Sequence, residues 1–144
     1  MTTIADILRH KESFAGGGTV TLAPDATVAE LAGTLTEHRI GAVIVVDGAA
    51  VAGIVSERDV VRHLAAGGSL DRPIAEIMTT AVVSCHPDDP VESIAETMTE
   101  RRIRHMPVLD DGRLVGIVSI GDVVSSRIRQ LEQDRGQLEQ YIAG

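Results

Sequence analysis

Aromatic side chains are almost missing from this chain of 144 residues, which has no tryptophan, one tyrosine and one phenylalanine. Proteins that bind single-stranded nucleic acids stack the bases on such rings. Basic residues are also in the minority, because 21 acidic residues face 13 basic ones and leave a net charge of −8. Binding to DNA or RNA depends on neutralising phosphates with lysine and arginine. We therefore expect no nucleic-acid partner.

Cysteine and long apolar runs are scarce as well. Cys85 is the single cysteine, which excludes an internal disulfide and is typical of a reducing compartment. No apolar run approaches the length of a membrane span. The first residues, MTTIAD, have neither the basic start nor the hydrophobic stretch of a signal peptide. We expect a cytoplasmic protein with no membrane partner.

What the chain does have is an internal repeat. Residues 20–61 align with residues 83–124 at a constant offset of 63, with no gap and with 19 of 42 positions identical. The densest match pairs residues 53–61, GIVSERDVV, with residues 116–124, GIVSIGDVV. Repetition of this kind indicates two copies of one structural unit.

Each copy has the same expected order of elements, β-α-β-β-α. Short strands over residues 19–22 and 81–84 come first. Helices follow, because apolar residues recur at helical spacing: Val28, Leu31, Ala32 and Leu35, matched by Val91, Ile94, Ala95 and Met98. A hairpin comes next, with strands 43–46 and 51–55 in one copy and 106–109 and 114–118 in the other. A second helix then begins at Ser56 or Ser119.

The helices also carry signals for where they begin. Thr27 and Glu30 have the spacing of a capping box before the first helix. In the second copy, Asp89 is the expected N-cap and Pro90 the first helical residue.

A further match precedes the repeat, since residues 4–8, IADIL, resemble residues 74–78, IAEIM, at an offset of 70. The first copy thus carries seven extra residues, which fall within His10–Gly18 and end in three glycines. We expect a flexible surface loop there. The alternative is a lid over a ligand site.

One copy alone has too little apolar surface for a robust core. We therefore expect a mixed α/β (α+β) fold in which the two copies, residues 1–66 and 67–144, pack about a pseudo-twofold axis. The second copy ends in an extended helix over residues 123–142, with a stripe at a spacing of three and four that Arg135 interrupts: Val124, Ile128, Leu131, Leu138 and Ile142. This stripe needs a partner on its own domain or on a second subunit, and we favour a homodimer.

The motif Ser-x-x-Asp begins the second helix of each copy, as Ser56 with Asp59 and as Ser119 with Asp122. The free N–H groups and the dipole of a helix start attract a phosphate. An aspartate on the first turn can accept two hydrogen bonds from the cis-diol of a ribose. The same residues also fit a capping box, and the two interpretations are compatible because the serine can cap the helix when no ligand is bound.

The duplicated pattern Gly-apolar-apolar-Ser-x-x-Asp after a hairpin resembles the CBS (cystathionine β-synthase) domain family. Residues 40–45, IGAVIV, and 103–108, IRHMPV, resemble the family's entry into its second strand. The likeness covers roughly residues 3–126. It implies a stand-alone pair of CBS repeats with two clefts between them, which in many members bind AMP, ADP, ATP or S-adenosylmethionine. NADH is a further candidate. The likeness implies a regulatory protein that acts on a separate, unidentified partner, and not an enzyme.

The resemblance also assigns roles to residues. It implies ribose binding by Asp59, Asp122, Ser56 and Ser119. It implies phosphate binding by Arg39, Arg102, Arg104 and His105, and Arg58 is either a further phosphate ligand or an exposed helix residue. The adenine pocket is expected at Val20, Ile40, Val82, Ile103, Met106 and Pro107.

The two copies differ in charge around these positions. The second copy has Arg101, Arg102, Arg104 and His105 where the first has His38, Arg39, Gly41 and Ala42. The hypothesis is that the two sites are unequal, and that one prefers a nucleotide with more phosphates.

Other functions find less support in the sequence. The histidines and the cysteine have no metal-ligand spacing: His10, His38, His63, His86, His105 and Cys85. No nucleophile motif or phosphate-binding Gly-x-x-x-x-Gly-Lys is present, so we expect no catalytic residue and no metal site. A structural dimerisation module with vestigial clefts, and a metal or redox sensor that uses Cys85, remain the alternatives.

Overall fold

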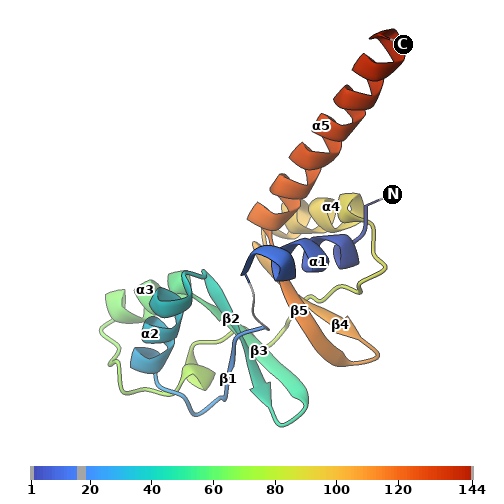
Figure 1. The fold of residues 1–144 in the computed structure, drawn as a ribbon. Helices are drawn as coiled ribbons and strands as arrows, with labels where there is room; N and C mark the ends of the chain where they lie inside the picture. Colours follow the sequence, from blue (N-terminus) through green and yellow to red (C-terminus); the bar gives the residue numbers. More distant parts are fainter. Residues whose placement is uncertain (1, 16–18, 144) are drawn as a thin grey trace. The chain divides into compact units, whose positions relative to one another are not determined.

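The computed structural model describes residues 2–15 and 19–143. The chain divides into two compact units (Figure 1). Unit 1 comprises residues 1–18, 84–110 and 116–144, and unit 2 comprises residues 19–83 and 111–115. The fold is mixed α+β with an extended C-terminal helix, as the sequence predicts. None of the helices in the described ranges is both long enough and apolar enough to cross a membrane.

Unit 2 contains the first copy of the repeat. Its elements are β1 (Thr21–Leu22), α2 (Val28–His38), β2 (Ala42–Asp47), β3 (Ala50–Ser56), α3 (Glu57–Ala65) and the 3₁₀ helix η1 (Ile74–Glu76). The strands form one sheet in the order β1-β2-β3, with β1 parallel to β2 and with β2 and β3 paired as an antiparallel hairpin. The predicted order β-α-β-β-α is therefore confirmed for this copy.

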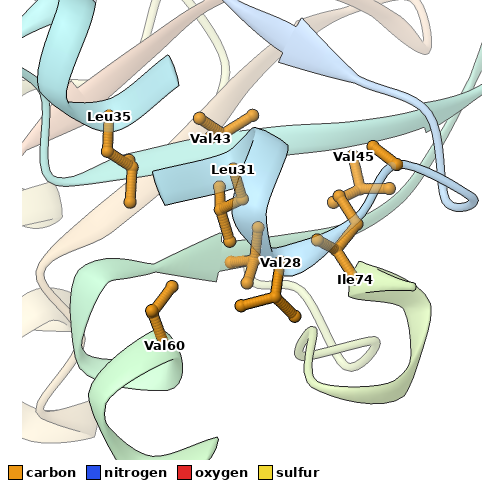
Figure 2. Packing of buried hydrophobic residues seen from close by; sticks show 9 residues of the cluster. Val28, Leu31, Leu35, Val43, Val45, Val60 and Ile74 are labelled. Carbon is orange, nitrogen blue, oxygen red and sulfur yellow. The ribbon is translucent and has the colours of Figure 1, made fainter. Parts of the chain in front are cut away.

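The core of unit 2 lies between the sheet and its helices (Figure 2). The apolar face of α2 contributes Val28, Leu31 and Leu35, and the spacing of these three residues places them on one side of the helix. Val43, Val45 and Val55 come from the hairpin, and Val60 and Ile74 complete the cluster. The helical periodicity in the sequence thus marks the residues that are buried.

Unit 1 contains the second copy. Its elements are α1 (Ile4–Ala15), α4 (Val91–Arg101), β4 (His105–Asp110), residues 116–119 of β5 (Arg113–Ser119), and α5 (Ile120–Ala143). Its buried apolar side chains are Ile4, Ile7, Cys85, Val91, Ile94, Met98, Met106, Val108, Val118 and Val123. Their counterparts in unit 2 are buried as well, except Leu22 and Ile77, which are partly buried against its core.

The first strand is shorter than predicted in the first copy, and in the second copy no strand forms over the predicted residues 81–84. Only Thr21 and Leu22 pair with β2 in unit 2, and in unit 1 only Cys85 forms a bridge, to Val108. The position that Ile44 occupies in β2 is held by Pro107 in β4. Because proline has no N–H to donate, a ladder hydrogen bond is lost there, and a single parallel bridge remains.

The segments that precede the two copies are exchanged between the units. In unit 1 the N–H of Ile4 donates to the carbonyl of Asp89 at 3.0 Å. In unit 2 the N–H of Ile74 donates to the carbonyl of Ala26, the residue that matches Asp89, at 2.8 Å. The alignment of residues 4–8 with 74–78 therefore identifies equivalent segments, but each one packs on the copy that does not follow it in the chain.

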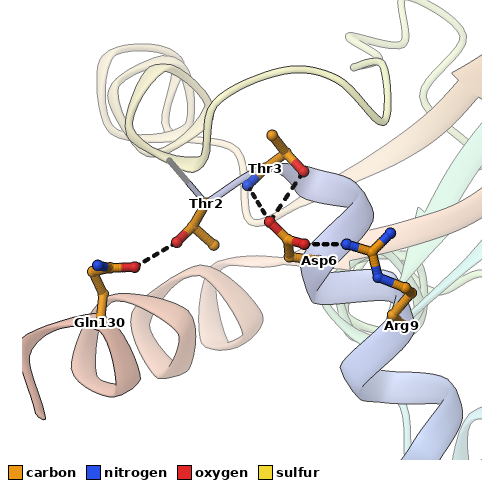
Figure 3. Close-up of polar contacts among 5 residues, drawn as sticks. All are labelled: Thr2, Thr3, Asp6, Arg9 and Gln130. Carbon is orange, nitrogen blue, oxygen red and sulfur yellow. Dashed lines mark hydrogen bonds and ion pairs between the residues drawn. The ribbon is translucent and has the colours of Figure 1, made fainter. Parts of the chain in front are cut away.

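The extra residues of the first copy form a helix where a loop was expected. Helix α1 runs from Ile4 to Ala15 and so includes residues 10–15 of the insertion, while Gly16, Gly17 and Gly18 lie outside the described residues. Asp6 stabilises the start of α1 by accepting hydrogen bonds from the N–H and the hydroxyl of Thr3, at 2.8 and 3.2 Å (Figure 3). These bonds hold the pKa of Asp6 below its ordinary value.

The start of α4 corrects a second expectation. Pro90 is the N-cap residue, with no side-chain hydrogen bond, and the helix begins at Val91. The carboxylate of Asp89 instead accepts from the N–H of His86 at 2.8 Å, within the turn that leads to the helix. The N–H of Val91 donates to the carbonyl of Thr2 at 3.0 Å, so the backbone just before α1 takes the place of a side-chain cap.

Candidate functional site

The Ser-x-x-Asp motif of unit 2 forms a capping box at the start of α3. Ser56 has an extended backbone conformation, and its hydroxyl accepts from the N–H of Asp59 at 3.4 Å. The carboxylate of Asp59 accepts in return from the N–H of Ser56 at 2.8 Å and from its hydroxyl at 3.0 Å. Both bonds end on Oδ2, so the cap does not use the second carboxylate oxygen.

The motif of unit 1 repeats this arrangement at the start of α5. The N–H of Ser119 donates to Oδ2 of Asp122 at 2.8 Å, and the N–H of Asp122 donates to the hydroxyl of Ser119 at 3.1 Å. The capping interpretation of the motif is therefore confirmed in both units. It is compatible with a ligand, because each cap uses only Oδ2 and the side chains of Asp59 and Asp122 are only partly buried.

The two motifs differ in one contact that the sequence did not suggest. Lys11, the only lysine of the chain, reaches from α1 to unit 1's motif. Its Nζ donates to Oδ2 of Asp122 at 2.9 Å and to the carbonyl oxygen of Ile117 at 2.8 Å. A cation from the predicted insertion thus lies against one of the two carboxylates that were assigned to ribose.

The arginines that precede the hairpins occupy equivalent and uncommon backbone conformations. Arg39 ends α2 with φ 53° and ψ 48°, and Arg102 ends α4 with φ 54° and ψ 43°. This left-handed region is entered by few residues other than glycine. The next residue donates its N–H back into the helix, from Ile40 to Leu35 and from Ile103 to Met98, both at 3.1 Å.

A backbone hydrogen bond then joins each arginine-bearing segment to the start of the following helix. The N–H of Glu57 donates to the carbonyl of Gly41 at 3.0 Å, and the N–H of Ile120 donates to the carbonyl of Arg104 at 2.8 Å. The predicted phosphate-binding segments and the Ser-x-x-Asp motifs, about 15 residues apart in the sequence, are thereby neighbours within each unit. Arg39, Arg58, Arg102 and Arg104 are exposed, and His105 begins β4.

Unit 2 has a depression at this junction. Its volume is about 260 Å³, and it is lined by Leu35, Thr36, Arg39, Ile40, Gly41 and Glu57. Pockets that enclose a drug-sized ligand start at roughly 300 Å³, so this one has room for part of a nucleotide. Arg39 supplies a positive charge to its lining and Glu57 a negative one.

The residues assigned to the adenine pocket lie at different depths. Val20 and Ile40 are partly buried and pack against the core of unit 2. Val82 and Ile103 are also partly exposed, whereas Met106 and Pro107 are buried in unit 1. Val20, Ile40, Val82 and Ile103 are therefore the members of this set that a ligand could touch without a change in the core.

The cysteine and its neighbours have the properties of structural residues. Burial, and to a lesser degree the negative charge of Asp89, raises the pKa of the Cys85 thiol to about 12. Reactive and redox-sensing cysteines have lowered pKa values and are accessible. His86 lies 3.3 Å from a carboxylate oxygen of Asp110 and 3.6 Å from one of Asp88. Within the described ranges, no three side chains of the metal-binding types come together as a metal site.

Known proteins of a single family match this chain both in sequence and in structure. The family model of the CBS domain matches residues 18–66 and 74–129. A CBS-domain-containing protein from Agrobacterium tumefaciens superimposes with a TM-score of 0.80 at 44% identity, over 88% of this chain and 99% of that one.

Two similar structures contain ligands. A CBS domain protein from Pyrobaculum aerophilum, complexed with AMP, has a TM-score of 0.75 at 30% identity, over 84% of this chain and 89% of that one. The CBS domain pair of protein MJ0100, in complex with 5′-methylthioadenosine and S-adenosyl-L-methionine, has a TM-score of 0.77 at 31% identity, over 92% of this chain and 98% of that one.

Proposed function

The chain belongs to the CBS-domain family, and from this membership we propose that it binds adenine nucleotides at the Ser-x-x-Asp helix starts of its two units and thereby regulates a separate protein. AMP is the ligand of one similar structure, and S-adenosyl-L-methionine with 5′-methylthioadenosine of another. All three molecules contain adenine and a ribose with a cis-diol. The proposal makes the chain a sensor with no catalytic step of its own.

One observation carries the proposal. In each unit a backbone hydrogen bond brings the arginine-bearing segment to the helix start where a partly exposed aspartate lies. A helix start and an arginine attract phosphate, and the aspartate accepts hydrogen bonds from the ribose hydroxyls. The three kinds of group that a nucleoside phosphate requires therefore occur together twice, at equivalent positions.

The two surfaces are unequal in this proposal. The carboxylate of Asp122 already binds Lys11 at 2.9 Å, so a ribose must share or displace that ammonium group. Unit 1 in turn carries more positive charge near its motif, from Lys11, Arg102 and Arg104. We expect unit 2 to bind AMP more tightly, and unit 1 to favour a ligand with more phosphates.

A thermal-shift screen tests the proposal. Saturation with AMP, ADP, ATP or S-adenosylmethionine is expected to raise the melting temperature by about 5 °C or more, because a ligand that binds only the folded state stabilises it. 2′-Deoxyadenosine 5′-monophosphate is the matched control, since it lacks one diol hydroxyl and should give a smaller shift.

Other outcomes of the same screen separate the alternatives. No shift with any adenine ligand at millimolar concentration would contradict the proposal and favour a structural module with vestigial sites. A shift with zinc alone would favour the metal-sensing alternative. NADH is included as the larger dinucleotide.

A further inference from the structure

Helix α5 carries most of the exposed large apolar side chains of the described chain. Six of the ten such residues lie on it: Val124, Ile128, Leu131, Leu138, Tyr141 and Ile142. Their exposed fractions range from 50% at Val124 to 86% at Tyr141. We call Val124, Ile128, Leu131, Leu138 and Ile142 the α5 stripe. Side chains of this type on one face of a helix mark an interaction surface.

Unit 1 uses a different face of α5 for its own packing. Val123 and Ser126 are buried, and Arg127 forms an ion pair with Glu92 of α4 at 2.7 Å. Further along the same face, Gln130 accepts a hydrogen bond from the hydroxyl of Thr2 at 2.6 Å (Figure 3). The α5 stripe takes no part in these contacts and is available to another molecule.

The second half of α5 has almost no packing of its own. From residue 131 to residue 143 every side chain is exposed, Gly136 apart, and Figure 1 shows the helix continuing past α1 and α4 within its unit. A helical segment of this length is marginally stable in water without tertiary contacts. A partner along the α5 stripe would stabilise it.

The α5 stripe has the period of a two-stranded coiled coil. Val124, Leu131 and Leu138 recur every seven residues at position d, and Ile128 and Ile142 lie at position a with Arg135 between them. This heptad is continuous from residue 124 to residue 142. Arg135 is the one polar residue of this heptad pattern and lies near its middle. The orientation in which two such helices can pair therefore depends on Arg135.

Arg135 distinguishes the two orientations. In a parallel, in-register pair the guanidinium groups of the two Arg135 residues would meet in the seam, where like charges repel. In an antiparallel pair centred near Gln133, Arg135 of one copy faces Leu131 of the other and lies beside that copy's Glu132. Every position a then faces a position d, with Val124 opposite Ile142 and Ile128 opposite Leu138.

We propose that the α5 stripe pairs in an antiparallel orientation with the α5 stripe of a second copy of this chain. The stripe is complementary to itself in this register, both in apolar side chains and in the charges of Arg135 and Glu132, as a twofold-symmetric interface requires. The pairing does not depend on nucleotide binding.

Sedimentation equilibrium of the full chain tests the pairing. The wild-type chain is expected to form dimers at micromolar concentrations, and a Leu131→Glu, Leu138→Glu variant to dimerise at least about 100-fold more weakly, because two charges enter the apolar seam. Both leucines are exposed, so the variant keeps its fold, which circular dichroism verifies. Gln133→Glu with Gln140→Glu is the matched control, since it adds the same charge on the opposite face and should leave the dimer unchanged. A wild-type monomer, a dimer that survives the leucine substitutions, or capture of a different protein by a monomeric chain would overturn the proposal.

Cysteine cross-linking tests the orientation. Glu132 lies close to the twofold axis of the antiparallel pair, so Glu132→Cys is expected to form a disulfide between two copies on oxidation. Val124→Cys faces Ile142 in that pair and should not cross-link to itself. Native Cys85 is buried and serves as an internal background. Cross-linking through Val124→Cys in place of Glu132→Cys, or through neither, would contradict the antiparallel pairing.

Discussion

Replacement of both Asp59 and Asp122 by asparagine is expected to weaken the binding of AMP by about 100-fold or more. Each carboxylate would lose its charge-assisted hydrogen bonds to the ribose, and a bond of this type contributes about 1.5–3 kcal/mol, or roughly 10- to 100-fold in affinity. Calorimetric titration measures the change. Asparagine retains one side-chain oxygen to accept from the N–H of Ser56 or Ser119, so the helix cap persists.

The single variants and a control sharpen this prediction. Asp59→Asn is expected to weaken AMP binding more than Asp122→Asn, because the Asp122 carboxylate is already paired with Lys11. Glu30→Gln is the matched control: Glu30 forms a capping box with Thr27 at the start of α2 and belongs to neither Ser-x-x-Asp motif. Unchanged affinity in the double variant, or an equal loss in Glu30→Gln, would show that the aspartates do not bind the ribose.

Leu31→Ala is expected to lower the free energy of unfolding by about 3 kcal/mol. Leu31 is fully buried at the centre of the unit 2 core, between α2 and the hairpin (Figure 2). Its truncation removes apolar contacts and leaves a cavity, for which Leu→Ala substitutions cost about 2–5 kcal/mol. Urea denaturation measures the loss.

Leu70→Ala is the control for this substitution. Leu70 is 45% exposed in the same unit, so the same chemical change should cost less than about 1 kcal/mol. Equal losses for the two variants would contradict the placement of the core between α2 and the hairpin.

The two hairpins, helices α2, α3 and α5, and the starts of these helices could be predicted because their signals are local. Apolar residues recur at the helical spacing along α2, and the pair Thr27 and Glu30 forms the capping box that their spacing indicates. The repeat supplied independent support, since the helical spacing and the Ser-x-x-Asp motif both occur twice. The duplicated Ser-x-x-Asp motif also indicates the family, because it is specific as a pair and weak alone.

Most features that could not be predicted from the sequence depend on contacts between residues that are far apart in the chain. The match between residues 4–8 and 74–78 identifies equivalent segments, but it cannot say which copy each one packs on. The same holds for Lys11 and Asp122, 111 residues apart, whose contact depends on that exchange. The extra residues after His10 ended in glycines, which favoured a loop over the helix that forms there.

Two further features that were not predicted concern backbone conformation and helix capping. Arg39 and Arg102 adopt left-handed conformations that glycine or asparagine usually signals, and arginine gives no such signal. Asp89 had the chemistry of an N-cap, but the carbonyl of Thr2, distant in the sequence, satisfies the N–H group at the start of α4 instead.

The most direct test of the central claim is an amide chemical-shift titration of the ¹⁵N-labelled chain with AMP. Binding at the helix starts predicts saturable shifts that are largest at the amides of residues 39–41 and 56–60 in unit 2, with weaker saturation at residues 102–104 and 119–123 in unit 1. No saturable shifts at millimolar AMP, or shifts that cluster away from both Ser-x-x-Asp motifs, would contradict the account.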